Sequence, residues 1–145
     1  MPSRTTSVLI QHRWLEHGRA VLLLASVAEI VLLTLLPAHG PHDLELRPFS
    51  DIGPALRQPL AHGHAAGAVG NLLLFLPFGA ALCLRRWRLG AAAGAGLAFS
   101  VSIELAQLAL PGRTTSVDDV ILNTLGAAAG WAFVALLRRL GVGRA

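Results

Sequence analysis

Long apolar stretches alternate with short polar segments along this chain. A helix needs about 20 mostly apolar residues to cross a bilayer, and four stretches qualify, at about residues 20–37, 65–84, 89–110 and 120–137. A helix with one wet face would carry regularly spaced polar residues, and transmembrane strands would be shorter and alternating. The pattern therefore predicts an all-α fold, a polytopic membrane bundle of four transmembrane helices forming a single domain over residues 1–145.

The arginines predict how these helices are oriented. By the positive-inside rule, Arg and Lys collect in the cytoplasmic segments next to membrane spans. Only Arg47, Arg57 and Arg113 lie in the loop of about residues 38–64 or in the turn of residues 111–118. The other nine precede the first span, join the second to the third or follow the fourth: Arg4, Arg13, Arg19, Arg85, Arg86, Arg88, Arg138, Arg139 and Arg144. Both termini are therefore predicted to be cytoplasmic.

Composition narrows the class of protein. Charged residues make up 14% of the chain and hydrophobic residues 54%, whereas about a quarter of a soluble domain is charged. This argues against a water-soluble enzyme and predicts a multi-pass protein of the cell membrane. The net charge of +4 is read as a topology signal, so no nucleic-acid partner is expected. A single cysteine, Cys83, excludes an internal disulfide and any multi-cysteine metal site, and no cofactor is predicted.

Polar residues inside the predicted spans are the main functional signal, because such residues are costly in a bilayer. In the third span Ser100, Glu104 and Gln107 recur at helical spacing and share one face. Asn71 and Glu104 each lie about 9 Å from the outer end of their span, and Asn123 lies near the outer end of the fourth. We therefore predict one ligand-binding cluster in the outer leaflet: Asn71, Ser100, Glu104, Gln107, Arg113, Asp118, Asp119 and Asn123.

A purely structural role for this cluster stays open. Asn, Gln and Glu side chains hydrogen-bond between membrane helices, and Arg113 with an aspartate could tie down its turn. Asp118 and Asp119 also suit a helix N-terminus, where negative charge is favoured. At least one of the two is open to that role alone.

Two further groups of polar residues are considered outside the cluster. Glu29, near the middle of the first span, is either a protonated helix contact or a proton-relay group. The outer loop contains His39, His42, His62 and His64, and imidazole is a common zinc ligand. Because no helical spacing brings these histidines together, they are interpreted as solvated loop residues, and no metal site is predicted.

Three segments resemble a known family. FSVSIELAQLALPGRTTSVDDVILNTLGAAAG, residues 99–130, is similar to the most distinctive segment of the VanZ-like membrane proteins, in which Ile-Glu-x-x-Gln is followed by Arg and then by Asp-Asp-x-x-x-Asn-x-x-Gly. NLLLFLPFG, residues 71–79, resembles the family's Asn-x-x-x-Phe-x-Pro-Phe-Gly helix. LELRPFSDI, residues 44–52, is similar to an outer-loop segment, with Glu45 where the family usually has asparagine and Arg47 where it has an aliphatic residue. The resemblance covers about residues 44–131.

The resemblance implies a small integral membrane protein of a family whose founding member confers teicoplanin resistance. Carrying its motif over selects six positions that the topology argument also brings together: Asn71, Glu104, Gln107, Arg113, Asp119 and Asn123.

Three classes of function are compatible with this site. In the first, it binds the polar headgroup of a membrane lipid or of a lipid-linked cell-wall precursor, or a glycopeptide, and so modulates the envelope or its teicoplanin-type susceptibility. Arg113 would then face a phosphate, and Glu104, Gln107 and Asn71 would face hydroxyls or amides. In the second, an intramembrane lipid-modifying enzyme uses Glu104 or Asp119 as its acid or base. The absence of a serine–histidine pair at the site leans against an enzyme. In the third, the chain is a structural subunit of an assembly or a homo-oligomer.

Overall fold

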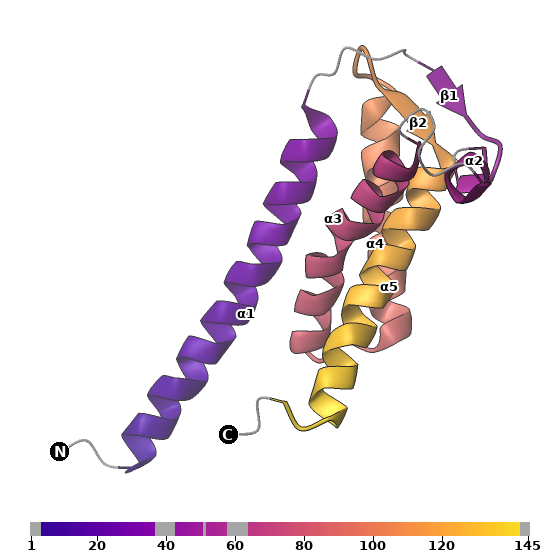
Figure 1. The fold of residues 1–145 in the computed structure, drawn as a ribbon. Coiled ribbons are helices and arrows are strands. Elements are labelled where there is room, and N and C mark those ends of the chain that lie inside the picture. Colours follow the sequence, from indigo (N-terminus) through magenta and orange to yellow (C-terminus); the bar gives the residue numbers. More distant parts are fainter. Residues whose placement is uncertain (1–3, 37–42, 51, 58–63, 143–145) are drawn as a thin grey trace.

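The computed structural model describes residues 4–36, 43–50, 52–57 and 64–142. Its elements are α1 (Arg4–Leu35), β1 (Asp43–Glu45), α2 (Ile52–Arg57), α3 (His64–Leu84), α4 (Leu89–Gln107), β2 (Thr114–Ser116) and α5 (Val117–Arg139) (Figure 1). In α1, α3, α4 and α5 the structure contains helices long and apolar enough to cross a membrane. This confirms the prediction of a helical fold with four candidate spans.

The ends of the helices differ from the prediction in two places. The first helix begins at Arg4, far before the apolar stretch, because hydropathy reports only the part of a helix that is apolar. The helix of the third predicted span, α4, ends at Gln107 instead of residue 110. Beyond it the amides of Ala109 and Leu110 donate to carbonyls only three residues back, which tightens the chain into a turn.

A two-stranded parallel sheet and the short helix α2 were not predicted. The register pairs Asp43 with Thr114 and Glu45 with Ser116, so each strand has three residues. Strands this short carry too little alternation to be detected in the sequence. The strands lie at the same end of the molecule as α2 (Figure 1). Their pairing joins β1 to β2, which leads directly into α5.

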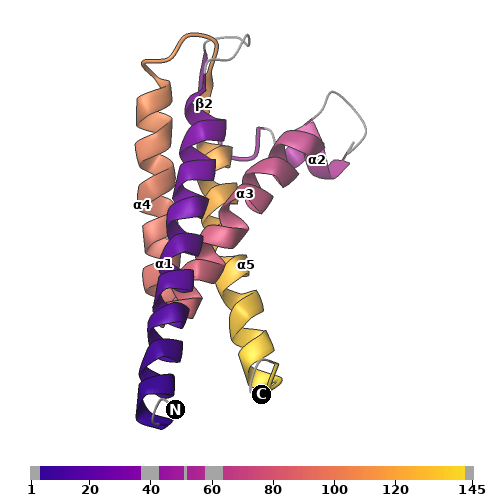
Figure 2. The same ribbon diagram turned by 90° about the vertical axis from the view of Figure 1, so that its left-hand side faces the viewer.

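The spanning helices run alternately in opposite directions. The start of α1 and the end of α5 lie at one end of the molecule, and β1, β2 and α2 lie at the other (Figures 1 and 2). This arrangement agrees with the prediction that both termini share one side of the membrane. That this side is the cytoplasm stays a prediction from the arginines.

The closest packing of the bundle is between α3 and α5, and glycines permit it. A β-carbon at Gly126 or Gly130 of α5 would collide with the backbone carbonyl of Leu72 or Leu76, respectively. On α3, a β-carbon at Gly79 would collide with the carbonyl of Ala127. Small residues let membrane helices approach until their backbones touch, so these glycines fix how α3 and α5 cross.

Aromatic side chains fill the space between α3 and α4. Phe78 and Phe99 have ring centroids 5.6 Å apart, and Phe75 lies 5.9 Å from Phe99. Phe75 is fully buried, as is Ile30 of α1. This core joins α1, α3 and α4 below the level at which the polar side chains gather.

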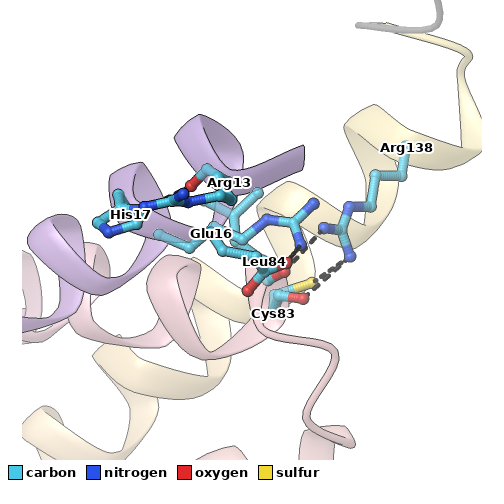
Figure 3. Close-up of polar contacts among 7 residues, drawn as sticks. Arg13, Glu16, His17, Cys83, Leu84 and Arg138 are labelled. Atoms are coloured by element: carbon cyan, nitrogen blue, oxygen red, sulfur yellow. Dashed lines mark hydrogen bonds and ion pairs between the residues drawn. The ribbon is translucent and has the colours of Figure 1, made fainter. Parts of the chain in front are cut away.

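At the opposite end, α5 is fastened to the last turn of α3 (Figure 3). Arg138 donates to the carbonyl oxygens of Cys83 at 2.9 Å and Leu84 at 3.4 Å. The last carbonyls of a helix lack partners within it and attract positive charge. Arg138 thereby adds to the backbone hydrogen bonds at the end of α3 and fixes the end of α5 against it.

Candidate functional site

The end of α1 is held by side chains from outside that helix. Its last turn contains no basic residue, although its final carbonyls need donors. Gln107 at the end of α4 donates from Nε2 to the carbonyl of Thr34 at 2.9 Å. Arg113 donates from Nη2 to Leu33 at 3.1 Å and to Leu36 at 2.6 Å, and from Nε to Leu36 at 3.1 Å. Two predicted site residues therefore anchor α1.

Other predicted residues link the remaining helices in pairs. Asn71 of α3 donates from Nδ2 to Oδ1 of Asp119 on α5. Asn123 of α5 donates to the Ser100 hydroxyl of α4 at 2.9 Å. These bonds give the residues the structural role that the sequence left open.

Glu104 connects α4 to the start of α5. Its Oε2 accepts from the backbone amide of Ser116 at 2.9 Å. The Ser116 side chain in turn accepts from the amide of Asp118 and caps α5, as serine commonly does at the first position of a helix. Glu104 therefore stabilises the turn that leads into α5.

A cavity of about 380 Å³ lies among these contacts. All four spanning helices contribute to it at the end that also contains β1 and β2. Its walls are formed by Leu33, Thr34, Gly70, Asn71, Leu74, Ile103, Glu104, Gln107, Gly112, Arg113, Thr114, Asp119 and Asn123. The structure thus brings together Asn71, Glu104, Gln107, Arg113, Asp119 and Asn123, six of the eight predicted positions.

The other two predicted residues, Ser100 and Asp118, do not line the cavity. Ser100 is fully buried, where it receives the hydrogen bond from Asn123. Asp118 is also fully buried and accepts from the amides of Phe49 at 2.6 Å and Ile52 at 3.0 Å. Asp118 therefore fastens the segment between β1 and α2 to the start of α5.

The sequence interpretation missed the contribution of α1 to the site. Leu33 and Thr34 form part of the wall, yet no residue of the first span was predicted there. Thr34 carried a weak signal, as a polar residue near the outer end of an apolar run. Leu74 and Ile103 were also missed, because an apolar wall residue cannot be distinguished from a core residue by sequence.

Two amide oxygens at the cavity have no hydrogen-bond partner among the described residues. They are Oε1 of Gln107 and Oδ1 of Asn123, both buried. Gln107 is only 6% exposed and Asn123 only 2%. Leaving a buried acceptor unsatisfied costs about 1–3 kcal/mol, so a donor from water or from a ligand is expected at each oxygen.

The remaining polar residues considered from the sequence lie elsewhere. Glu29 is exposed on α1 and takes no part in the cavity. His39, His42 and His62 are outside the described residues, as is the side chain of His64. Within the part of the chain that the structure describes, no three His, Cys, Asp or Glu residues are grouped so as to hold a metal ion.

Comparison with known proteins assigns the chain to one family. A family model described as VanZ/LLP1 matches residues 20–138, a range that extends the resemblance to the first spanning helix. The matched range includes every residue of the cavity wall. No curated protein and no solved structure matches the chain.

Proposed function

The chain belongs to the VanZ/LLP1 family, and from this membership and the cavity we propose that it is a membrane protein that binds the polar headgroup of a lipid. The observation that carries the proposal is the cavity of about 380 Å³, which lies among four apolar helices and is walled by two carboxylates, three amides and a guanidinium. Polar groups of this density inside membrane spans are costly unless they meet a polar partner.

The wall of the cavity has the mixed character that a lipid requires. Leu33, Leu74 and Ile103 supply apolar surface beside Glu104 and Gln107. A headgroup with the first carbons of its lipid would find both kinds of partner.

The size of the cavity supports a headgroup over a whole antibiotic. Small-molecule pockets span about 300–1,000 Å³, and this cavity lies near the lower limit. It fits a phospholipid headgroup or one polar unit of a lipid-linked cell-wall precursor. A glycopeptide is much larger, so any change in teicoplanin-type susceptibility would follow indirectly, from altered lipid or precursor exposure in the outer leaflet of the cell membrane.

Acid–base chemistry on the bound lipid is the second candidate. The observation that favours it is the presence of both Glu104 and Asp119 in one cavity wall. The third class, an assembly subunit that uses its polar residues between chains, has less support, because Asn71, Gln107 and Asn123 each donate within this chain.

Two glycines of α3 provide a matched test of lipid binding. Gly70 lines the cavity, and Gly67 lies one turn earlier outside it. Neither would bring a β-carbon within 4 Å of another group. Gly70→Leu should therefore fill the cavity without breaking a hydrogen bond, while Gly67→Leu adds the same side chain elsewhere.

The measurement is native mass spectrometry of the purified protein with dioleoyl phospholipids. Retention of one lipid per chain should fall about tenfold in Gly70→Leu and stay at the wild-type level in Gly67→Leu. Equal retention by both variants would contradict binding in the cavity. A lipid product of new mass, absent in Glu104→Gln, would favour the enzymatic candidate instead.

A further inference from the structure

Each amide nitrogen of the cavity residues donates one hydrogen bond within the protein. Gln107 gives Nε2 to a backbone carbonyl, which can only accept, so its amide orientation is determined by that contact. Asn71 and Asn123 give their Nδ2 groups to Asp119 and Ser100. The buried amide atoms without a partner among the described residues are the oxygens of Gln107 and Asn123.

Arg113 is committed in a similar way. Three hydrogen bonds from Nε and Nη2 hold its guanidinium at the last carbonyls of α1. A phosphate bound in bidentate fashion needs the edge of a guanidinium that carries two parallel N–H groups. The expectation that Arg113 serves a phosphate therefore competes with its role at the end of α1.

The buried side-chain atoms of the cavity residues that lack a partner among the described residues are hydrogen-bond acceptors. Oε1 of Gln107 and Oδ1 of Asn123 are buried without partners in the described part of the chain. Glu104 accepts from Ser116 through Oε2, and a carboxylate offers about four acceptor positions in all. These acceptors belong to residues of α4 and α5 that line the same cavity.

The net charge of the cavity wall also favours a ligand that donates hydrogen bonds and carries positive charge. Glu104 and Asp119 contribute two carboxylates against the single guanidinium of Arg113. Charges in a membrane interior require compensation by opposite charge. An added cation would compensate this wall, whereas a headgroup whose only charge is that of its phosphate would be repelled by both carboxylates.

We propose that the cavity selects a lipid headgroup bearing a primary ammonium group, which donates to the amide oxygens of Gln107 and Asn123 and pairs with Glu104 and Asp119. An ammonium has three donors and no acceptor, so it complements a wall of this kind. The proposal rests on the proposed function, since it names the class of lipid that enters the same cavity.

Three lipids with identical dioleoyl chains test this selection by native mass spectrometry. Phosphatidylethanolamine carries the ammonium, phosphatidylglycerol carries hydroxyls, and phosphatidic acid carries the phosphate alone. We expect phosphatidylethanolamine to bind about tenfold more tightly than phosphatidic acid, with phosphatidylglycerol between them. Gly70→Leu should abolish this preference.

Charge-neutral variants separate the ammonium contact from simple filling of the cavity. Glu104→Gln and Asp119→Asn keep an oxygen for the amide of Ser116 and for Asn71, so the helices stay linked. Each should reduce the preference for phosphatidylethanolamine about tenfold. Glu29→Gln makes the same chemical change on an exposed face of α1 and should leave the preference unaltered.

The outcomes distinguish the two proposals. Equal binding of all three lipids, lost in Gly70→Leu, would overturn ammonium selection and leave lipid binding intact. Binding that Gly70→Leu does not weaken would overturn both. Displacement of the lipid by an equal concentration of soluble O-phosphoethanolamine would overturn the assignment of the ammonium group to a lipid.

Discussion

Single side chains of this protein hold its helices together and, in the proposed function, also meet the ligand. Gln107 is the clearest case, because its amide nitrogen holds the end of α1 while its oxygen has no partner among the described residues. Glu104 likewise uses one oxygen for the amide of Ser116. Replacing such a residue changes both roles, so informative variants must preserve one of them.

Glu104 separates the two roles in a stability experiment. Glu104→Leu leaves the Ser116 amide without its acceptor, which should lower the free energy of unfolding by about 1–3 kcal/mol. Glu104→Gln retains an oxygen at that position and should cost less than half as much. Thermal unfolding in detergent compares the variants, and equal losses would show that the hydrogen bond to Ser116 is unimportant.

Asp118 should control the segment between β1 and α2 without affecting lipid binding. Asp118→Asn replaces one of the two oxygens that accept from Phe49 and Ile52, and an amide nitrogen cannot accept. Hydrogen exchange at whichever of these two amides faces the new amide nitrogen should become about tenfold faster, in line with the loss of a hydrogen bond to a charged group.

Asp43→Asn is the control, because the exposed carboxylate of Asp43 accepts from the amide of its neighbour Leu44. Exchange at Phe49 and Ile52 should be unchanged in this variant. A slower rate of lipid binding in Asp118→Asn, with unchanged exchange, would contradict the role assigned to this carboxylate.

The sequence identified six of the thirteen residues of the cavity wall but could not separate the two neighbouring aspartates. Helical spacing puts residues of one helix on a common face, and depth in the membrane aligns faces of different helices. Which of Asp118 and Asp119 turns inward depends on the rotation of α5 about its axis. That rotation follows from the contacts of Gly126 and Gly130 with α3, which no pattern within α5 reveals.

At the scale of elements, the glycines of α3 and α5 determine the geometry of the bundle. Gly130→Ala would place a β-carbon against the Leu76 carbonyl, which the backbone of α3 can relieve only by moving. Overpacking of this kind costs about 1–3 kcal/mol. Gly94→Ala, where a β-carbon meets nothing within 4 Å, should be neutral or stabilising by up to about 1 kcal/mol.

Unfolding of both variants in the same detergent checks this difference. Equal stability of Gly130→Ala and the wild type would mean that α3 and α5 are not in backbone contact.

The family pattern Asn-x-x-x-Phe-x-Pro-Phe-Gly has a physical basis in α3. Asn71 lines the cavity, Phe75 and Phe78 fill the core, and Gly79 meets α5.

The strands could not be predicted from the sequence, because their pairing is not a local property of either segment. β1 and β2 pair across about 70 residues of sequence, and each is too short to show alternation. Their pairing depends on α1 and α5 placing the two segments side by side. Only the assembled bundle specifies that contact, whereas the apolar length of each span is a local property.

At the scale of the whole molecule, the direction of insertion is the open prediction. Leu44 of β1 is 48% exposed and Leu140, after α5, is 68% exposed, at opposite ends of the bundle. Single cysteines at these positions, introduced with Cys83→Ala, should differ in labelling. An impermeant thiol reagent should modify Leu44→Cys in intact cells and Leu140→Cys only after permeabilisation.

The reverse labelling pattern would place the cavity in the inner leaflet. The arginine distribution argues against that result, since nine of twelve arginines lie on the side of the termini. A cavity on the outer side would be positioned to affect lipids that an external antibiotic encounters.

The central claim, that an ammonium-bearing headgroup occupies the cavity, has a direct test. The sequence contains two asparagines, Asn71 and Asn123, and both line the cavity. Carbon-13 labelling of asparagine therefore places every label at the site. Solid-state NMR in membranes of nitrogen-15-labelled phosphatidylethanolamine should show magnetisation transfer between the lipid ammonium and the asparagine carboxamides, and Gly70→Leu should remove it. Resolved asparagine signals without such transfer in the wild type would contradict the claim.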